Sequence, residues 1–330
     1  MKRCQWRLVL GCLLLGGVVA PGGGIWCATA GADEAVTFAD PNLETAVRDR
    51  LGIPPPEPVT ATDMLGLYSL HVAGTGITDL AGLEYATNLE LCFADFNAIT
   101  SVEPLRELTP LVDLQLSSNL LTDISPIAGL TNLTVLNLGA NHLTQVDVLS
   151  EMTKLDGLAL YRNDISDISP LASLHELGDL DLTGNCVADV APLAGLTELN
   201  VLGLGGNGLS DIAPLAGLSE LRGLLLEENQ ISDISPLAWL TGLDYLDLRG
   251  NPLNQAAYDT YLPLIEANNP GIELHYDPIP EPATLALVIV GAAAIFGRTR
   301  QGANRTPRGH VLRCPEADPE RETGHGTHEV

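Results

Sequence analysis

A column of aspartates recurs along the chain at a spacing that could support metal chemistry. Its members are separated by 22 or 44 residues: Asp79, Asp123, Asp167, Asp189, Asp211 and Asp233. Carboxylates brought together in this way are ligands for divalent cations such as Ca²⁺. Because no D-x-D-x-D-G loop accompanies them, we favour the alternative that each carboxylate accepts hydrogen bonds from nearby backbone N–H groups.

A second set of residues is suited to binding a ligand rather than to catalysis. Its members are aromatic, basic or acidic and recur near one repeat position: Phe93, Phe96, Tyr161, Arg162, Asp181, Glu227, Tyr245 and Arg249. Aromatic and arginine side chains are typical anchors of binding surfaces. Glycines such as Gly157, Gly203 and Gly205 lie between them and predict a shallow surface. The alternative is a solvated scaffold face without a ligand.

The sequence contains no motif for enzyme chemistry. It has no G-x-S-x-G, H-E-x-x-H, phosphate-binding loop or dinucleotide fingerprint. Its formal net charge is −26, with 16 Lys and Arg against 42 Asp and Glu. Such acidity excludes a nucleic-acid partner, which requires basic residues to neutralise phosphates. We therefore expect a binding or structural protein, without a catalytic residue, cofactor or metal.

A repeat of 22 residues must position these candidate side chains. Eight asparagines mark it without an insertion: Asn97, Asn119, Asn141, Asn163, Asn185, Asn207, Asn229 and Asn251. Around each of them, apolar residues follow the pattern L-x-x-L-x-L-x-x-N-x-L, which is typical of leucine-rich repeats. We expect each asparagine amide to bond the backbone of its own and neighbouring coils, forming a structural ladder.

The repeat predicts an α/β solenoid, a leucine-rich repeat horseshoe. In each Leu-x-Leu the two leucines point inward from a short parallel strand on the concave face. The returns, such as Asp-Ile-Ser-Pro-Leu-Ala at 167–172, predict 3₁₀ or single-turn pieces on the convex face. A helix at 40–52, with Asp40 as N-cap and Gly52 as stop, is expected to cap the N-terminal end. A helix at 255–267, kinked at Pro263, and a strand at 272–274 are expected at the other end.

Over residues 37–277 this pattern resembles the internalin-like leucine-rich repeat proteins of bacterial surfaces. The features that carry the resemblance are the 22-residue period, the Asp-Ile-Ser-Pro-Leu-Ala returns and the helical N-terminal cap. The resemblance implies a protein that binds a partner through its concave face. The same repeat length also resembles an intracellular class of phosphatase regulators.

The first 30 residues are typical of a secretory signal. Lys2, Arg3 and Arg7 precede the apolar run 8–20, and Ala28-Thr29-Ala30 forms a cleavage site. We therefore expect export rather than the intracellular alternative.

A second targeting signal follows the repeats. Pro280-Glu281-Pro282, the apolar run 283–297, Arg298 and Arg300 together resemble a PEP-CTERM sorting signal, which is read by an exosortase-like membrane enzyme. The apolar run is shorter than the roughly 20 residues of a full membrane span, and the arginines after it suit a cytoplasmic side. Such signals normally end soon after the arginines, whereas here the polar segment 301–330 follows.

Six cysteines are present, three of them within the predicted signal. Cys92 occupies a core leucine position, and Cys186 lies four coils later. At about 4.8 Å per coil they would be about 19 Å apart, beyond the reach of a disulfide. Both are therefore predicted to be free thiols. Cys314 and its neighbouring histidines are expected to lie in a disordered tail.

These features predict six segments. They are a signal peptide at 1–30, an N-terminal cap at 31–66, repeats at 67–251, a C-terminal cap at 252–278, a sorting segment at 279–300 and a disordered tail at 301–330. The predicted function is binding of a protein or polysaccharide partner at the cell surface or in the extracellular matrix. Predicted partners also include the export machinery, an exosortase-like enzyme and the inner membrane, which residues 283–297 would enter at least transiently. The alternative is a structural matrix protein without a specific ligand.

Overall fold

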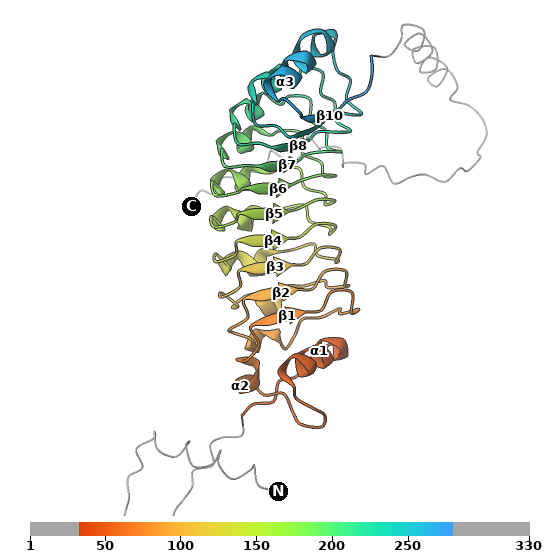
Figure 1. Cartoon of the computed structure of the whole chain (residues 1–330). Coiled ribbons are helices and arrows are strands. Elements are labelled where there is room, and N and C mark those ends of the chain that lie inside the picture. Colours follow the sequence, from red (N-terminus) through yellow and green to blue (C-terminus); the bar gives the residue numbers. More distant parts are fainter. Residues whose placement is uncertain (1–32, 280–330) are drawn as a thin grey trace, which may run out of the picture. The chain divides into compact units, whose positions relative to one another are not determined.

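The computed structural model describes residues 33–279. They fold into a series of stacked coils, and each coil contributes one strand to a single parallel sheet (Figure 1). Ten strands of three residues follow one another in sequence order, each paired in parallel with the next. They are β1 Ser69–His71, β2 Leu91–Phe93, β3 Asp113–Gln115, β4 Val135–Asn137, β5 Gly157–Ala159, β6 Asp179–Asp181, β7 Val201–Gly203, β8 Gly223–Leu225, β9 Tyr245–Asp247 and β10 Glu273–His275. The predicted leucine-rich repeat solenoid is confirmed.

Short 3₁₀ helices carry the chain back on the opposite side from the strands (Figure 1). They are η1 Leu83–Tyr85, η2 Glu103–Leu105, η3 Ser125–Gly129, η4 Asp147–Glu151, η5 Ser169–Ser173, η6 Ala191–Gly195, η7 Ala213–Gly217 and η8 Ser235–Trp239. Six of them have proline at the start, where the absent N–H removes no helical hydrogen bond. The outward face of the sheet is called the concave face below.

The aspartate column caps these returns. In each case the carboxylate accepts a hydrogen bond from the N–H two residues later, as Asp167 does from Ser169 at 2.8 Å. The same bond recurs at Asp79, Asp123, Asp189, Asp211 and Asp233. These bonds hold the pKa of Asp123 and of Asp167 below the usual value. The backbone-acceptor interpretation of the column is confirmed.

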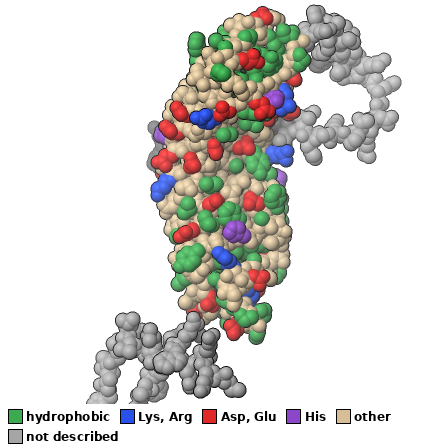
Figure 2. All heavy atoms as spheres, in the orientation of Figure 1, with side chains coloured by type: hydrophobic (Ala, Val, Ile, Leu, Met, Phe, Trp, Pro, Cys, Tyr) green, Lys and Arg blue, Asp and Glu red, His purple; other side chains and the backbone are tan. Residues whose placement is uncertain are grey.

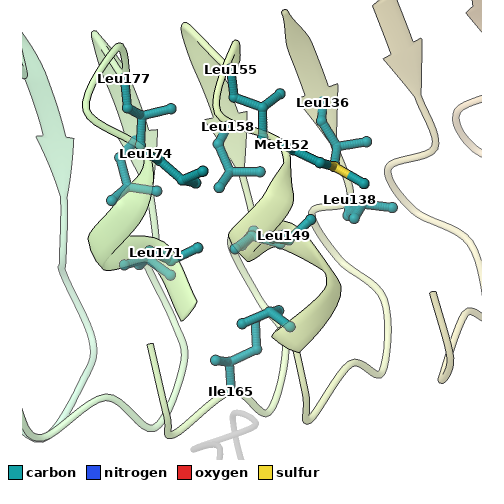
Figure 3. Close-up of a cluster of buried hydrophobic side chains, with 14 of the residues drawn as sticks. Leu136, Leu138, Leu149, Met152, Leu155, Leu158, Ile165, Leu171, Leu174 and Leu177 are labelled. Atoms are coloured by element: carbon teal, nitrogen blue, oxygen red, sulfur yellow. The ribbon is translucent and has the colours of Figure 1, made fainter. Parts of the chain in front are cut away.

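The core is a continuous stack of leucines that lies between the strands and the 3₁₀ helices (Figure 3). Equivalent residues of successive coils, such as Leu149 and Leu171, point into the same interior layer. One coil leaves its apolar side open, so each coil is stabilised by the coils on either side of it. Cys92 replaces a leucine in this stack and is buried, and burial raises the pKa of its thiol to about 12.

Cys92 is a free thiol, as the sequence predicts, whereas Cys186 is disulfide-bonded. The prediction of a free thiol at Cys186 is therefore wrong. Cys186 follows ladder residue Asn185 and is half-buried, outside the leucine stack, so the reason that keeps Cys92 a buried thiol does not apply to it. The repeat geometry excludes only a bond between Cys186 and Cys92.

The N-terminal cap is helix α1 Pro41–Leu51, with Asp40 as N-cap and Gly52 as a left-handed C-cap. Asp40 also accepts hydrogen bonds from the N–H and the hydroxyl of Thr78, at 2.8 and 3.0 Å, which ties the cap to the first coil. A second short helix, α2 Ala61–Met64, begins with a capping box at Thr60 and Asp63. The sequence prediction includes α1 but lacks α2.

The C-terminal cap contains a π-type turn, η9 Ala257–Tyr261, which continues directly into helix α3 Leu262–Asn268. This agrees with the predicted helix and places its irregularity just before Pro263. Asn269 then closes the stack, since its amide accepts from the N–H of Leu243 and donates to the carbonyl of Leu240, at 2.9 and 2.8 Å. The expected last strand is present as β10, one residue later than predicted.

Candidate functional site

The asparagine ladder sets the geometry beside the concave face. Asn163 is representative: its Oδ1 accepts from the N–H of Leu143 at 3.0 Å. Its Nδ2 donates to the carbonyls of Leu138, Leu160 and Tyr161, at 3.1, 2.9 and 3.3 Å. One side chain therefore bonds its own coil and the coil before it. At the first coil, Thr75 takes this place and donates from its hydroxyl to the Val72 carbonyl at 2.8 Å.

The residue before each ladder position adopts a left-handed backbone conformation, because the chain must turn sharply off the strand. Glycine fills this place in four coils, at Gly74, Gly184, Gly206 and Gly250. In the other five coils the residue carries a side chain: Phe96, Ser118, Ala140, Arg162 and Glu228, with φ between 51° and 55°. This conformation costs about 1–2 kcal/mol for a residue other than glycine. Two of the predicted site residues, Phe96 and Arg162, are held in it.

Aromatic residues gather at the N-terminal end of the concave face. The rings of His71 on β1 and Phe93 on β2 are stacked, with centroids 4.5 Å apart. Phe96, just after β2, is 67% exposed. From α1, Arg50 donates through Nε to the carbonyl of Ser69 on β1, at 3.0 Å, so the cap helix adjoins this end.

Tyr161 and Arg162 lie at the middle of the array. The Tyr161 ring covers Gly139 on the preceding coil so closely that a Cβ added there would lie 2.2 Å from it. The glycine thus makes room for the ring. Arg162 is exposed, and the ion pairs within residues 33–279 do not include it. Its guanidinium is free to meet a ligand.

Tyr245, Arg249 and Glu227 form a cluster with Asp247 at the C-terminal end. Arg249 donates through Nε to both oxygens of the buried Asp247 carboxylate, at 2.9 and 3.0 Å. Burial raises the pKa of Asp247, but hydrogen bonds from the side chain and backbone of Arg249 outweigh it and hold the pKa below its usual value. The Tyr245 ring packs at a tilt against His275 on β10, with centroids 5.4 Å apart.

Glu227 is the exception in this cluster. Its Oε2 is buried and is the one such side-chain atom in the described part of the chain without a hydrogen-bond partner. Burial, and the nearby Asp247 carboxylate, raise the pKa of Glu227. The carboxylate lies over Gly205, where an added Cβ would come within 2.2 Å of Oε1. Glycine in the preceding coil again accommodates a larger side chain.

The concave face is hollowed between these two groups, at its centre. The hollow has a volume of about 500 Å³ and is lined by residues of strands β3–β8. It exists because Gly157, Ala159 and Gly203 leave space where neighbouring coils carry larger side chains. Asp179 and Asp181 on β6 also line it. Larger side chains stand around the glycines at this point, so the surface that they make forms a hollow.

The structure thus distributes the predicted site residues over three places. Phe93 and Phe96 lie at the N-terminal end, Glu227, Tyr245 and Arg249 lie together at the C-terminal end, and Asp181 lines the central hollow. Tyr161 and Arg162 are close to the centre but do not line the hollow. The sequence prediction omits Asp179 and Val201, and it includes Gly157 and Gly203 only as the cause of a shallow surface. A run of small residues at successive concave positions, beside two aspartates, is the signal that could have found them.

Residues 109–151 match the protein family described as leucine-rich repeats (two copies). The crystal structure of internalin C2 from Listeria monocytogenes is 40% identical, covering 64% of this chain and 94% of that one, with a TM-score of 0.62. The chain belongs to the internalin-like leucine-rich repeat proteins. Curated protein sequences give no significant match.

Two more distant structures share the leucine-rich repeat fold. The functional domain of InlJ from Listeria monocytogenes, whose description includes a cysteine ladder, is 22% identical, with a TM-score of 0.61. It covers 75% of this chain and 63% of that one. The leucine-rich repeat protein LIC12759 from Leptospira interrogans is 23% identical, with a TM-score of 0.54, covering 66% of this chain and 62% of that one.

Acidic side chains are spread over the drawn face of this internalin-like chain, with few basic ones among them (Figure 2). Within residues 33–279, His, Cys, Asp and Glu side chains do not form a group of three or more that could hold a metal ion. Across the same range, every helix is too short or too polar to cross a bilayer. The predicted membrane and sorting residues, Pro280, Glu281, Pro282, the run 283–297, Arg298 and Arg300, lie outside the described part.

Proposed function

We propose that this internalin-like protein is exported and binds a protein or polysaccharide partner through its concave face, without enzymatic activity. The observation that carries the proposal is Phe96. Its side chain is 67% exposed, and its backbone has a left-handed conformation that glycine would adopt at lower cost. Selection for stability alone disfavours an exposed aromatic ring and a left-handed backbone at the same residue. An aromatic binding anchor, in contrast, must be exposed.

Two further observations support binding along the same face. Arg162 is also exposed in the left-handed conformation and has a guanidinium without an ion pair in the described part. Solenoids bind partners over extended concave surfaces, and the resemblance to internalins implies the same use of the face. Phe93, Tyr161, Asp181, Glu227, Tyr245 and Arg249 complete the proposed contact residues.

Binding is tested by passing a cell-surface extract of the source organism over the immobilised purified chain. The captured partner is then purified and its affinity measured by calorimetry against Phe96→Gly and Tyr161→Ala. Both substitutions are expected to weaken binding by about tenfold or more, the usual effect of losing an aromatic anchor. Ser118→Gly is the matched control, since it removes a side chain from the same left-handed position one coil later. Equal affinities for all variants would overturn the assignment of this face.

Targeting forms a separate part of the proposal. The signal at 1–30 and the sorting segment at 279–300 would direct the chain to the inner membrane and then to the cell surface or matrix. The cargo would be the N-terminal cap, the repeats and the C-terminal cap. An exosortase-like enzyme would read Pro280-Glu281-Pro282. The mass of the mature protein from the source organism tests both signals at once. We expect loss of residues 1–30, and recovery of the intact chain from the cytoplasm contradicts export.

The second candidate function is a structural matrix protein without a specific ligand. The observation in its favour is the run of glycines on the concave face, since Gly203, Gly205 and Gly223 offer no side chain for recognition. This candidate predicts that the capture experiment yields no saturable partner.

A further inference from the structure

The central hollow combines two chemical properties. Its floor and walls are mainly apolar, formed by buried Leu158, by Leu225 and by Val201, which is 42% exposed. Asp179 and Asp181 lie on β6, between Gly157 and Ala159 of β5 on one side and Val201 and Gly203 of β7 on the other. Among residues 33–279, the side chains that line the hollow include no basic one. The hollow is therefore an apolar pocket with a negative rim.

The two rim carboxylates are not neutralised within the described part of the chain. Asp179 is exposed and takes part in no ion pair or side-chain hydrogen bond there, and Asp181 accepts only the N–H of Thr183, at 2.9 Å. Two basic side chains of other coils bind elsewhere. Lys154 donates to the amide oxygen of Asn132 at 2.7 Å, and Arg222 pairs with Asp244 at 3.5 Å.

This combination selects the chemistry of the occupant. An uncharged ligand that covered the hollow would remove water from two carboxylates without replacing its hydrogen bonds, which is unfavourable. A cationic group restores these interactions, and electrostatic complementarity of this kind selects partners. Lysine and arginine side chains supply such a group at the end of an apolar stem that packs on aliphatic residues. A volume of about 500 Å³ lies within the range of small-ligand pockets, and it suits one or two such side chains.

We propose that the hollow binds a lysine or arginine side chain carried by a basic segment of a partner protein. This inference rests on the proposed function and narrows the partner from a protein or polysaccharide to a protein. The described lining residues include no aromatic side chain on which a sugar ring could stack, and an acidic polysaccharide would be repelled by the rim. The cationic side chain would contact Asp179 and Asp181 while its stem lies along Val201 and Leu225.

Two glycines of the same repeat position provide a matched pair of variants. A Cβ at Gly157 would lie 3.8 Å from the Val135 side chain, and a Cβ at Gly223 would lie 3.6 Å from the Val201 side chain, both ordinary contacts. Only Gly157 lines the hollow. Gly157→Val therefore fills the hollow and Gly223→Val does not. Both should fold at least as stably as the parent chain, because valine is favoured over glycine in strands.

The probe is a displayed library of random short peptides, selected on the purified chain. We expect the enriched peptides to carry lysine or arginine beside an aliphatic residue, and to bind more weakly as salt is added. Gly157→Val should reduce their affinity by about tenfold or more, the effect of removing space for a single methylene or larger group. Asp179→Asn should reduce it by a similar factor, whereas Gly223→Val should leave it unchanged.

Three results would overturn the inference. They are enrichment of neutral or acidic peptides, absence of any enrichment, and equal binding by the two valine variants. Competition by a neutral oligosaccharide at the hollow would likewise assign it to a sugar. The proposed function fails separately. A captured partner that still binds Gly157→Val but not Phe96→Gly leaves concave-face binding intact and removes only the hollow's role.

Discussion

The asparagine ladder and the concave face lie side by side in every coil, yet they differ in how their residues vary. The ladder position keeps asparagine in eight successive coils. Six of the eight are buried, and the side-chain bonds follow the same pattern from coil to coil. The concave positions change from phenylalanine to glycine, aspartate, tyrosine and arginine over the same coils. The uniform column stabilises the stack, and the variable columns are free to specify a partner. The following predictions test this division, from the largest expected effect to the smallest.

The ladder should dominate stability. Asn163→Ala removes four hydrogen bonds and leaves the buried N–H of Leu143 without its acceptor. We expect the free energy of unfolding in urea to fall by about 2–4 kcal/mol. Asn137→Ala on the concave face is the control, since its one side-chain bond is to the N–H of Gly139, at 3.1 Å. It should cost about 1 kcal/mol or less, and equal losses would contradict the division.

Phe96 should show the reverse behaviour. Phe96→Gly relieves the left-handed conformation at φ 55° and removes an exposed ring. We expect the free energy of unfolding to rise by about 1 kcal/mol or less. The relief of the left-handed conformation raises it, and the greater chain entropy of glycine in the unfolded state offsets part of the gain. Thermal unfolding of this variant beside Ser118→Gly provides the measurement. A marked loss of stability would show that the ring is structural, and would remove the basis of its role as an anchor.

The C-terminal cluster should show two opposite pH dependences of small size. The pKa of Asp247 is below 3.8, so its contribution to stability is complete above about pH 4 and is lost as pH falls through the folded-state pKa. The pKa of Glu227 is above 4.5, so the protonated form favours folding, and stability declines as pH rises through its folded-state pKa. Urea titrations across acidic pH give the free energy of unfolding at each pH. For Asp247→Asn this free energy should fall less steeply as pH decreases, and for Glu227→Gln the decline with rising pH should be absent. Parallel curves for both variants would contradict these assignments.

The sequence predicts the parts of this structure that depend on one residue and the backbone. The Asn163 amide and the Asp167 carboxylate bond main-chain groups at fixed offsets, so a period of 22 residues is enough to place them. The cap at Asp40 and Gly52 is predicted for the same reason. The α2 helix was missed because its four residues are too few to show an apolar period.

The central hollow and the buried oxygen of Glu227 depend instead on pairs of side chains from different coils. Considered alone, Gly157 predicts only a shallow surface, and it creates depth only beside Val135 and Val201. Gly205 similarly permits Glu227 to fold down over it. Such relations become visible only when the coils are stacked, which is why the sequence predicts the concave face as a site but not its shape.

The central claim is that the variable concave face binds a partner while the ladder only supports it. The most direct measurement is the affinity of the captured partner for Phe96→Gly, compared with the parent chain, together with the stability of each. The account predicts an affinity lower by about tenfold or more in a variant that unfolds no more readily. A partner that binds Phe96→Gly as tightly as the parent, or the absence of any saturable partner, would contradict it.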